Sequence, residues 1–337
     1  MKLSELLRKN ILEVDFGGIL NKFEIKIRRN VLFFEDIFTD YIKNCEDSGY
    51  GKEMEEIAHR WGLMGAKTFT PKFLKRITKP LYVAVARKVW KNMNIISEGR
   101  IIKENDKFVT FKLKNEFITR VIGKNRFATG FFIGCLEVLY KKKLTSVRIS
   151  QNSKNWSIYH LKFEDDSPQN ITKKSKPIYN NLNKLQKFDI PNLRNAIKEN
   201  LFQIDKNVIY FRGKRIIILE NTIFHLIANN SILMNNVSDI SYNFFKKIID
   251  KNSTIEDKLK LLKTILQVMG WGTVKILIQN KKIILNIRSP PYGLQQEKDN
   301  WDFIIKTVLG YMRLVNKKFR VEGVKTNYKM LKIIYSL

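Results

Sequence analysis

An internal repeat limits the possible folds of this chain more than any other feature of its sequence. The segment at 131–150, FFIGCLEVLYKKKLTSVRIS, is similar to the segment at 307–326, TVLGYMRLVNKKFRVEGVKT. When the two are aligned, Gly134 falls on Gly310. In both, an apolar helical pattern passes through a pair of lysines into an alternating strand pattern. An element that occurs twice along a chain predicts two similar domains.

Two further matches follow the same order along the chain. The apolar run RRNVLFFEDIF is matched by GKRIIILENTIF, so that Glu35 falls on Glu220. The strand pattern KFVTFKLKN at 107–115 is matched by KKIILNIRS at 281–289, with apolar residues at every second position in both. A repeat this long excludes a solenoid, whose units of about 20–45 residues contact only their neighbours.

The segment at 164–190 separates the two copies. It has no apolar periodicity and is rich in Asn, Lys, Ser and Pro, a composition typical of linkers. We therefore predict a first domain over 1–163, a basic polar linker over 164–190, and a second, shorter copy over 191–337. The chain has 337 residues, of which 44% are hydrophobic, so both copies can bury a core.

The net charge points to an anionic partner. Lys and Arg number 62 against 32 Asp and Glu, a formal net charge of +30, and the excess is distributed rather than gathered in a tail. Such a field attracts nucleic acid, a ribosome or an anionic membrane surface, because neutralised phosphates release condensed counterions. The alternative is that the excess lysine reflects composition and solubility alone.

The main candidate surface is a basic stripe in the predicted helical block at 71–96. Basic residues recur there on one helix face and continue past Pro80, with no acidic residue between Lys67 and Lys91. A solvated helix face is the alternative, although faces selected only for solubility usually mix both signs. The predicted nucleic-acid-binding residues of this stripe are Lys72, Lys75, Arg76, Lys79, Arg87, Lys88 and Lys91.

Other basic groups extend the predicted binding surface. They are Lys141, Lys142, Lys143, Arg212, Lys214, Arg215, Lys317, Lys318 and Arg320. The lysine pair at 141–142 recurs in the second copy at the end of the same helix, where cations favour the helix dipole, so it supports binding less than the stripe does. No RNA-recognition aromatic motif or helix-turn-helix signature accompanies these groups.

Motifs of catalysis and metal binding are missing from the sequence. None of the three histidines has a second His or Cys at ligand spacing, and the two cysteines form no CxxC pair. There is no GxxxxGK[ST] loop, dinucleotide fingerprint or GxSxG motif. We therefore expect a protein that is not an enzyme and that holds no metal or cofactor.

The expected compartment is the cytoplasm. Acidic residues interrupt the N-terminal stretch where a signal peptide is apolar, and no later window is long enough for a membrane span. The low cysteine content favours a reducing environment.

The order of elements in the first copy resembles the 4-vinyl reductase domain family. The resemblance is carried by NVLFFEDIF, GYGKEMEEIAHRWGLMGAK, TGFFIGCLEVLYKKKLTSVRIS and WSIYHLKF. It covers residues 21–163, and residues 205–337 through the repeat. It implies an α+β fold with two similar domains, each an antiparallel sheet packed against helices. It also implies frequent dimerisation, which leaves a homodimer and an internal pseudo-dimer open.

The resemblance further implies a buried pocket for a small apolar molecule. Many members of the family bind zinc through cysteines and a carboxylate in their last two strands, but VRISQNSKNWSIYHLKF contains neither. The zinc site is therefore expected to be lost. The residues expected near a pocket are Trp61, Met64, Phe131, Phe132 and Cys135, which as plain core need no ligand.

Three functions remain open from the sequence. The first is a non-enzymatic protein that binds nucleic acid or a nucleoprotein complex through a distributed positive surface. The second is a sensor or carrier of a small apolar ligand. The third is a structural subunit of a protein assembly, in which basic faces meet acidic partners.

Overall fold

A computed structural model describes the greater part of the chain. The described residues are 30–69, 83–84, 86–87, 90–91, 95–151, 156–165, 193–205, 208–279, 281–293, 299–327 and 330–337. No helix within these ranges combines the length and the hydropathy needed to cross a membrane.

The described residues form two compact units. The first unit holds residues 42–165, and the second holds residues 30–41 together with those from 193 to 337. The units differ from the predicted ranges in one respect, because residues 30–41 lie near the start of the chain and belong to the second unit. Helix α2 (Glu35–Asp47) begins in the second unit and ends in the first.

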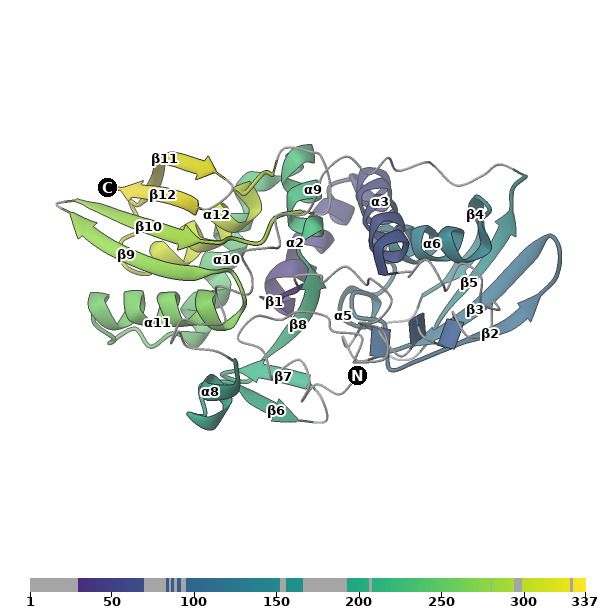
Figure 1. Cartoon of the computed structure of the whole chain (residues 1–337), viewed down its shortest axis with the longest axis horizontal. Helices are drawn as coiled ribbons and strands as arrows, with labels where there is room; N and C mark the ends of the chain where they lie inside the picture. Colours follow the sequence, from purple (N-terminus) through teal and green to yellow (C-terminus); the bar gives the residue numbers. More distant parts are fainter. Residues whose placement is uncertain are drawn as a thin grey trace, which may run out of the picture. The chain divides into compact units, whose positions relative to one another are not determined.

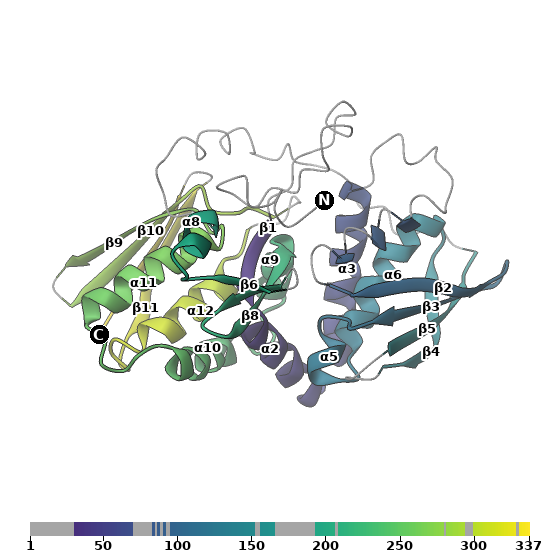
Figure 2. The same ribbon diagram turned by 90° about the horizontal axis from the view of Figure 1, so that it is seen from below.

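The first unit contains a four-stranded antiparallel sheet of order β2-β3-β5-β4. Helices α3 and α6 cover one face of this sheet (Figure 1; Figure 2). The elements of this unit that follow α2 are α3 (Gly51–Phe69), β2 (Glu98–Glu104), β3 (Phe108–Lys114), α5 (Thr119–Ile122), α6 (Arg126–Tyr140), β4 (Leu144–Ser150) and β5 (Trp156–Phe163).

Alternation along the strands separates the two faces of this sheet. In β3, Val109, Phe111 and Leu113 are buried, as the sequence pattern predicts for a half-buried strand. Phe111 stacks on Tyr159 of β5 with ring centroids 4.7 Å apart, and Phe132 of α6 packs on Tyr159 at 5.7 Å. The apolar core of the first unit therefore lies between this inner face and the helices.

Helices α3 and α6 approach each other so closely that glycine is required at their crossing. A Cβ atom placed on Gly134 would lie 2.2 Å from the carbonyl oxygen of His59, and one placed on Gly130 would lie 2.0 Å from that of Glu55. Both contacts are with backbone, which cannot move aside cheaply. The glycine that recurs in the sequence repeat is therefore a packing residue.

The second unit contains two four-stranded antiparallel sheets, of orders β1-β8-β7-β6 and β9-β10-β12-β11. Helix α12 packs on α10, as α6 packs on α3 in the first unit. Besides the start of α2, its elements are β1 (Asn30–Phe34), α8 (Leu193–Lys198), β6 (Gln203–Asp205), β7 (Val208–Phe211), β8 (Lys214–Glu220), α9 (Thr222–Asn230), α10 (Met234–Ile248), α11 (Ile255–Val268), β9 (Thr273–Gln279), β10 (Lys282–Arg288), α12 (Asp302–Met312), β11 (Arg320–Asn327) and β12 (Met330–Ser336).

The sheets β2-β3-β5-β4 and β9-β10-β12-β11 are two copies of one design. Their strand orders are the same, and Phe111 pairs with Tyr159 as Leu285 pairs with Ile333. Strands β4 and β11 also carry a bulge at the same place. It lies opposite Leu161 and His160 of β5 in the first copy, and opposite the equivalent Tyr335 and Ile334 of β12 in the second. The predicted α+β fold with two similar domains is thereby confirmed.

The recurring glycine also has the same role in both copies. A Cβ atom on Gly310 of α12 would lie 2.5 Å from the carbonyl oxygen of Ser238 on α10. The offset that aligns Gly134 with Gly310 in sequence therefore aligns two equivalent helix crossings. Because each crossing depends on a backbone-to-backbone approach, the repeat records a packing constraint.

The first strands of the two copies pair with each other. Strand β1 runs antiparallel to β8, with Val31 opposite Leu219 and Phe34 opposite Ile216. When Glu35 is aligned with Glu220, Val31 matches Ile216 and Phe34 matches Leu219, so the pairing is symmetric with respect to the repeat. This is the pattern of a two-fold interface between identical strands, made here within one chain.

Candidate nucleic-acid interface

The sheet of the first unit has an outer face, turned away from α3 and α6, that is basic. Strand alternation places Thr110, Lys112 and Lys114 of β3 on it, beside Trp156 and Ile158 of β5. No described helix covers this face in either view (Figure 1; Figure 2). The basic residues of this outer sheet face are Arg100, Lys103, Lys112, Lys114, Arg148 and Lys162.

Three of these cations lie over one aromatic ring. The Lys112 Nζ atom lies 4.3 Å from the centroid of the Trp156 ring, and the Lys114 Nζ atom lies 5.6 Å from it. The guanidinium carbon of Arg100 is 5.8 Å from the same centroid. Such cation–π contacts are favourable at partly exposed sites. They gather positive charge around a flat apolar plane that is only half-buried.

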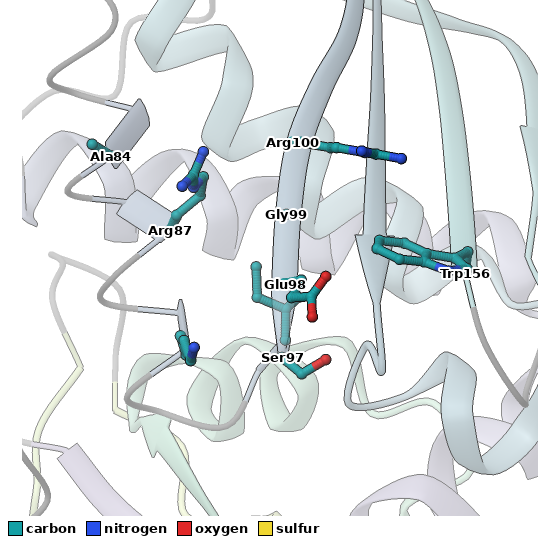
Figure 3. Close-up of a pocket in the computed structure, with 9 residues that line it drawn as sticks. Ala84, Arg87, Ser97, Glu98, Gly99, Arg100 and Trp156 are labelled. Carbon is teal, nitrogen blue, oxygen red and sulfur yellow. The ribbon is translucent and has the colours of Figure 1, made fainter.

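A groove lies beside the free edge of β2, next to this ring. Its cavity volume is about 490 Å³. Figure 3 shows Arg87 on one side of β2 and the side chains of Arg100 and Trp156 on the other. The Arg87 stem reaches the edge strand, because a Cβ atom on Gly99 would lie 3.7 Å from its Cγ atom. The lining residues are Ala84, Arg87, Lys91, Ile96, Ser97, Glu98, Gly99, Arg100 and Trp156.

The groove is basic in spite of its single carboxylate. Glu98 lies 3.9 Å from the Lys114 Nζ atom, with side chains 60% and 39% exposed, and an ion pair of that length and exposure is weak. Within the described residues, no carboxylate forms an ion pair with Arg87, Arg100 or Lys112. These charges are therefore available to an anionic ligand.

A second pair of rings lies farther along the outer sheet face. The rings of Phe108 and His160 are stacked, with centroids 5.1 Å apart and planes 13° from parallel. Thr110 Oγ1 lies 2.7 Å from His160 Nδ1, which fixes the imidazole plane. Aromatic surface therefore accompanies the basic residues at two places on β5.

The predicted basic stripe is only partly within the described chain. Arg87 and Lys91 are exposed and line the groove beside β2. The remaining stripe residues lie outside the described residues. They are Lys72, Lys75, Arg76, Lys79 and Lys88.

The lysines that end α6 are exposed but stand apart from the groove. Lys141 adopts a left-handed conformation with φ of 54° and caps the helix, and the Lys142 Nζ atom lies 5.6 Å from the Phe163 ring. In the second unit, Lys317, Lys318 and Arg320 are likewise exposed. The predicted residues in these two places are solvent-facing, and none of them is among the residues that line the groove.

The predicted group at 212–215 has partners within the second unit. The Lys214 Nζ atom lies 2.8 Å from Asp36 Oδ2, and Arg215 Nε lies 3.6 Å from Glu35 Oε2. Arg212 donates to the carbonyl oxygen of Ile248 at 2.8 Å. These contacts give the two basic residues at the start of β8, and Arg212 in the turn before it, partners within the second unit.

The residues predicted to line an apolar pocket are packed against one another. All five are buried: Trp61, Met64, Phe131, Phe132 and Cys135. The Trp61 and Phe131 rings lie 4.5 Å apart, and those of Phe131 and Phe132 lie 5.1 Å apart. Burial raises the pKa of the Cys135 thiol far above its usual value, so the thiol stays protonated. They form the core between α3, α6 and the sheet.

A buried carboxyl group, that of Glu116, lies between β3 and α5 of the same unit. Glu116 accepts hydrogen bonds from Tyr159 Oη at 2.5 Å and from Thr119 Oγ1 at 2.7 Å. Burial is the main cause that raises the pKa of Glu116 above its usual value. Among the described residues, no group of three or more His, Cys, Asp or Glu side chains could hold a metal ion.

Sequence reasoning missed the residues of the outer sheet face. Lys112 and Lys114 lie within the strand predicted at 107–115, where the apolar positions alone carry the prediction. The signal that could have found them is the polar half of the alternation, because Lys112 and Lys114 alternate with the buried Phe111 and Leu113 and so lie on the other face of the strand.

A scan of the sequence against protein-family models finds no match, and a search of curated proteins finds none either.

Proposed function

We propose that this protein is a non-enzymatic nucleic-acid-binding protein, whose binding surface is the outer sheet face of the first unit and the groove beside β2. The observation that carries the proposal is the Trp156 ring with Arg100, Lys112 and Lys114 around it. Clustered cations neutralise phosphates, and the released counterions make binding favourable. Nucleic acid within a nucleoprotein complex presents the same phosphates and is included in the proposal.

The net charge supports the same partner. A formal charge of +30 favours association with any polyanion, while the groove gives that field one place where cations lack carboxylate partners among the described residues. A surface selected only for solubility would mix both signs. The packing of the five predicted pocket residues gives no comparable support for a carrier of apolar ligands.

Binding of fluorescent DNA and RNA oligonucleotides tests the proposal. Anisotropy titrations at several salt concentrations should give affinities that fall steeply with salt, with a slope of about −0.7 to −0.9 for each phosphate contact. Arg100→Glu should weaken binding on the order of tenfold at about 50 mM salt.

Lys275→Glu is the matched control for this substitution. Lys275 is exposed and lies opposite Asn286 in the second unit, as Arg100 lies opposite Lys112 in the first. Its substitution should have a much smaller effect on affinity. Equal losses for the two variants would contradict the assignment to the first unit, and absence of binding at about 50 mM salt would contradict the function itself.

A further inference from the structure

We infer that the ligand of the outer sheet face is single-stranded nucleic acid, held by a base stacked on Trp156; this inference rests on the proposed function. The Trp156 ring is half-buried on a flat strand surface, and what lies over it is the cationic ends of flexible side chains, which a base can displace. In a duplex, both faces of each base are covered by its neighbours. Only an unpaired base can therefore use such a ring as a stacking partner.

Cations that a base displaces from the ring remain beside the stacked nucleotide. Lys112 and Lys114 come from the strand next to Trp156, and Arg100 comes from the strand beyond it. All three lie between 4.3 and 5.8 Å from the ring centroid. A base on the ring therefore brings its phosphates within reach of positive charge, which is the combination found in single-strand-binding surfaces.

The second pair of rings offers another contact along the same strand. Trp156 and His160 lie on the same face of β5, four residues apart, or roughly 13 Å at the usual rise of a strand. The stacked Phe108 and His160 rings end the outer sheet face on that side, with Arg148 opposite His160 on β4. Two aromatic sites separated by this distance suit a chain of several unpaired nucleotides.

The groove beside β2 offers a path by which the bound nucleic-acid strand can leave the sheet. β2 is the edge of its sheet, so its outer backbone N–H and C=O groups have no described strand to pair with. Arg87 and Lys91 face this edge from the other side of the groove. Backbone groups and cations together can bind phosphates and base edges without reading one sequence.

A comparison of single and double strands of one sequence tests this inference. Single strands should bind more tightly than the duplex at equal salt. Trp156→Ala should weaken single-strand binding by roughly 5- to 150-fold, the range expected for one stacked base, and should change duplex binding little. Trp156→Phe keeps an aromatic plane and should retain most of the affinity.

Two controls separate stacking from loss of structure. Met330→Ala changes the residue that occupies the position of Trp156 in the second copy, and it should leave binding unchanged. The thermal unfolding of Trp156→Phe should be close to that of the natural chain, and Trp156→Ala should unfold somewhat earlier because it loses the buried part of the ring and its cation contacts. If the alanine variant unfolds early, the phenylalanine variant and the strand comparison still decide the question.

The outcomes distinguish the inference from the proposed function. Equal affinity for duplex and single strand would overturn the stacking inference, and so would an equal loss of affinity for both ligands in Trp156→Ala. Binding that still fell with salt would, in either case, support the proposed function. Competition by poly-glutamate as effective as competition by single-stranded DNA would also overturn the inference, because an acidic peptide offers charge without bases. Failure to bind any oligonucleotide would remove both.

Discussion

The two copies of the sheet share their inner faces and differ on their outer faces. Phe111 and Tyr159 pair on the inner face of one copy as Leu285 and Ile333 pair in the other, and all four are buried. On the outer faces, aromatic rings of the first copy have aliphatic side chains as their equivalents. Trp156 and His160 correspond by register to Met330 and Ile334.

The cations on the outer faces differ as well. Lys112, which is the cation closest to the Trp156 ring, corresponds to Asn286, and Lys282 of the second copy is held by an ion pair with Glu322 at 2.5 Å. Substitutions on a packed inner face cost stability, while those on a solvated face cost little. The two copies therefore share their packing and differ on the outer face, where the candidate site of the first copy lies.

The largest expected effect tests the packing that both copies share. Gly134→Ala places a methyl group 2.2 Å from the His59 carbonyl oxygen and should destabilise the protein by about 1–3 kcal/mol or more. Gly310→Ala, with 2.5 Å to the Ser238 carbonyl oxygen, should follow it. Urea unfolding of each variant measures the change.

A glycine on α3 serves as the control for this pair. An added Cβ atom on Gly65 meets nothing within 4 Å, so Gly65→Ala should stabilise the helix by up to about 1 kcal/mol. If Gly134→Ala were as stable as Gly65→Ala, the close helix crossing would be wrong.

The next effect tests the difference in charge between the outer faces. The double variant Lys112→Glu with Lys114→Glu should reduce the salt slope of oligonucleotide binding by about two, one for each phosphate contact removed. Asn286→Glu with Arg288→Glu places glutamates at the equivalent positions of the second copy, and its slope should stay close to that of the natural chain. Identical salt slopes for the two double variants would contradict the proposed difference in binding between the two outer faces.

A third prediction concerns a polar group of the first copy. Tyr159, which donates to Glu116, corresponds to Ile333 in the second copy, so the second sheet lacks this donor. Because burial raises the folded-state pKa of Glu116 above its usual 4.5, folding disfavours the ionised carboxylate. The contribution of Glu116 to the free energy of unfolding is therefore fully present below about pH 4.5, and it is lost as the pH rises through the folded-state pKa.

Glu116→Gln should remove this part of the pH dependence. Unfolding free energies measured between about pH 4 and pH 8 should fall less with rising pH in the variant than in the natural chain. Parallel pH profiles for the two proteins would show that Glu116 does not titrate in the way its burial requires.

The smallest expected effect is a gain in the second copy. The double variant Asn286→Lys with Met330→Trp recreates part of the outer sheet face there, and oligonucleotide affinity should rise by only a few fold, because one stacked base is worth roughly 1–3 kcal/mol when fully formed. Met330→Trp alone should gain less, since it lacks the cation. No gain from the double variant would mean that the ring and its neighbouring lysine are insufficient.

Much of the fold follows from particular residues of the sequence. The alternation at Val109, Phe111 and Leu113 predicted a half-buried strand, and the match of Gly134 with Gly310 predicted equivalent elements. Both signals are local, because a strand alternates every two residues and a helix crossing needs a small residue at one point. Both signals therefore occur in each of the two copies.

The candidate site was less accessible from the sequence. Arg87 and Lys91 are the residues of the predicted stripe within the described ranges, and both line the groove, while the five predicted pocket residues are buried against one another. Large apolar side chains at helical spacing have the same pattern whether they line a cavity or fill it. Whether such residues leave space depends on the fit of neighbouring elements, which the pattern does not encode.

The repeat, the strand and helix periods and the excess of positive charge can all be read from the order of the amino acids. The pairing of β1 with β8, and the meeting of Arg100, Lys112 and Trp156 on one face, are visible only in the folded chain. The physical reason is that periodicity assigns a residue to one side of its own element, whereas contacts between elements depend on strand order and register. Those are set by packing across the whole sheet.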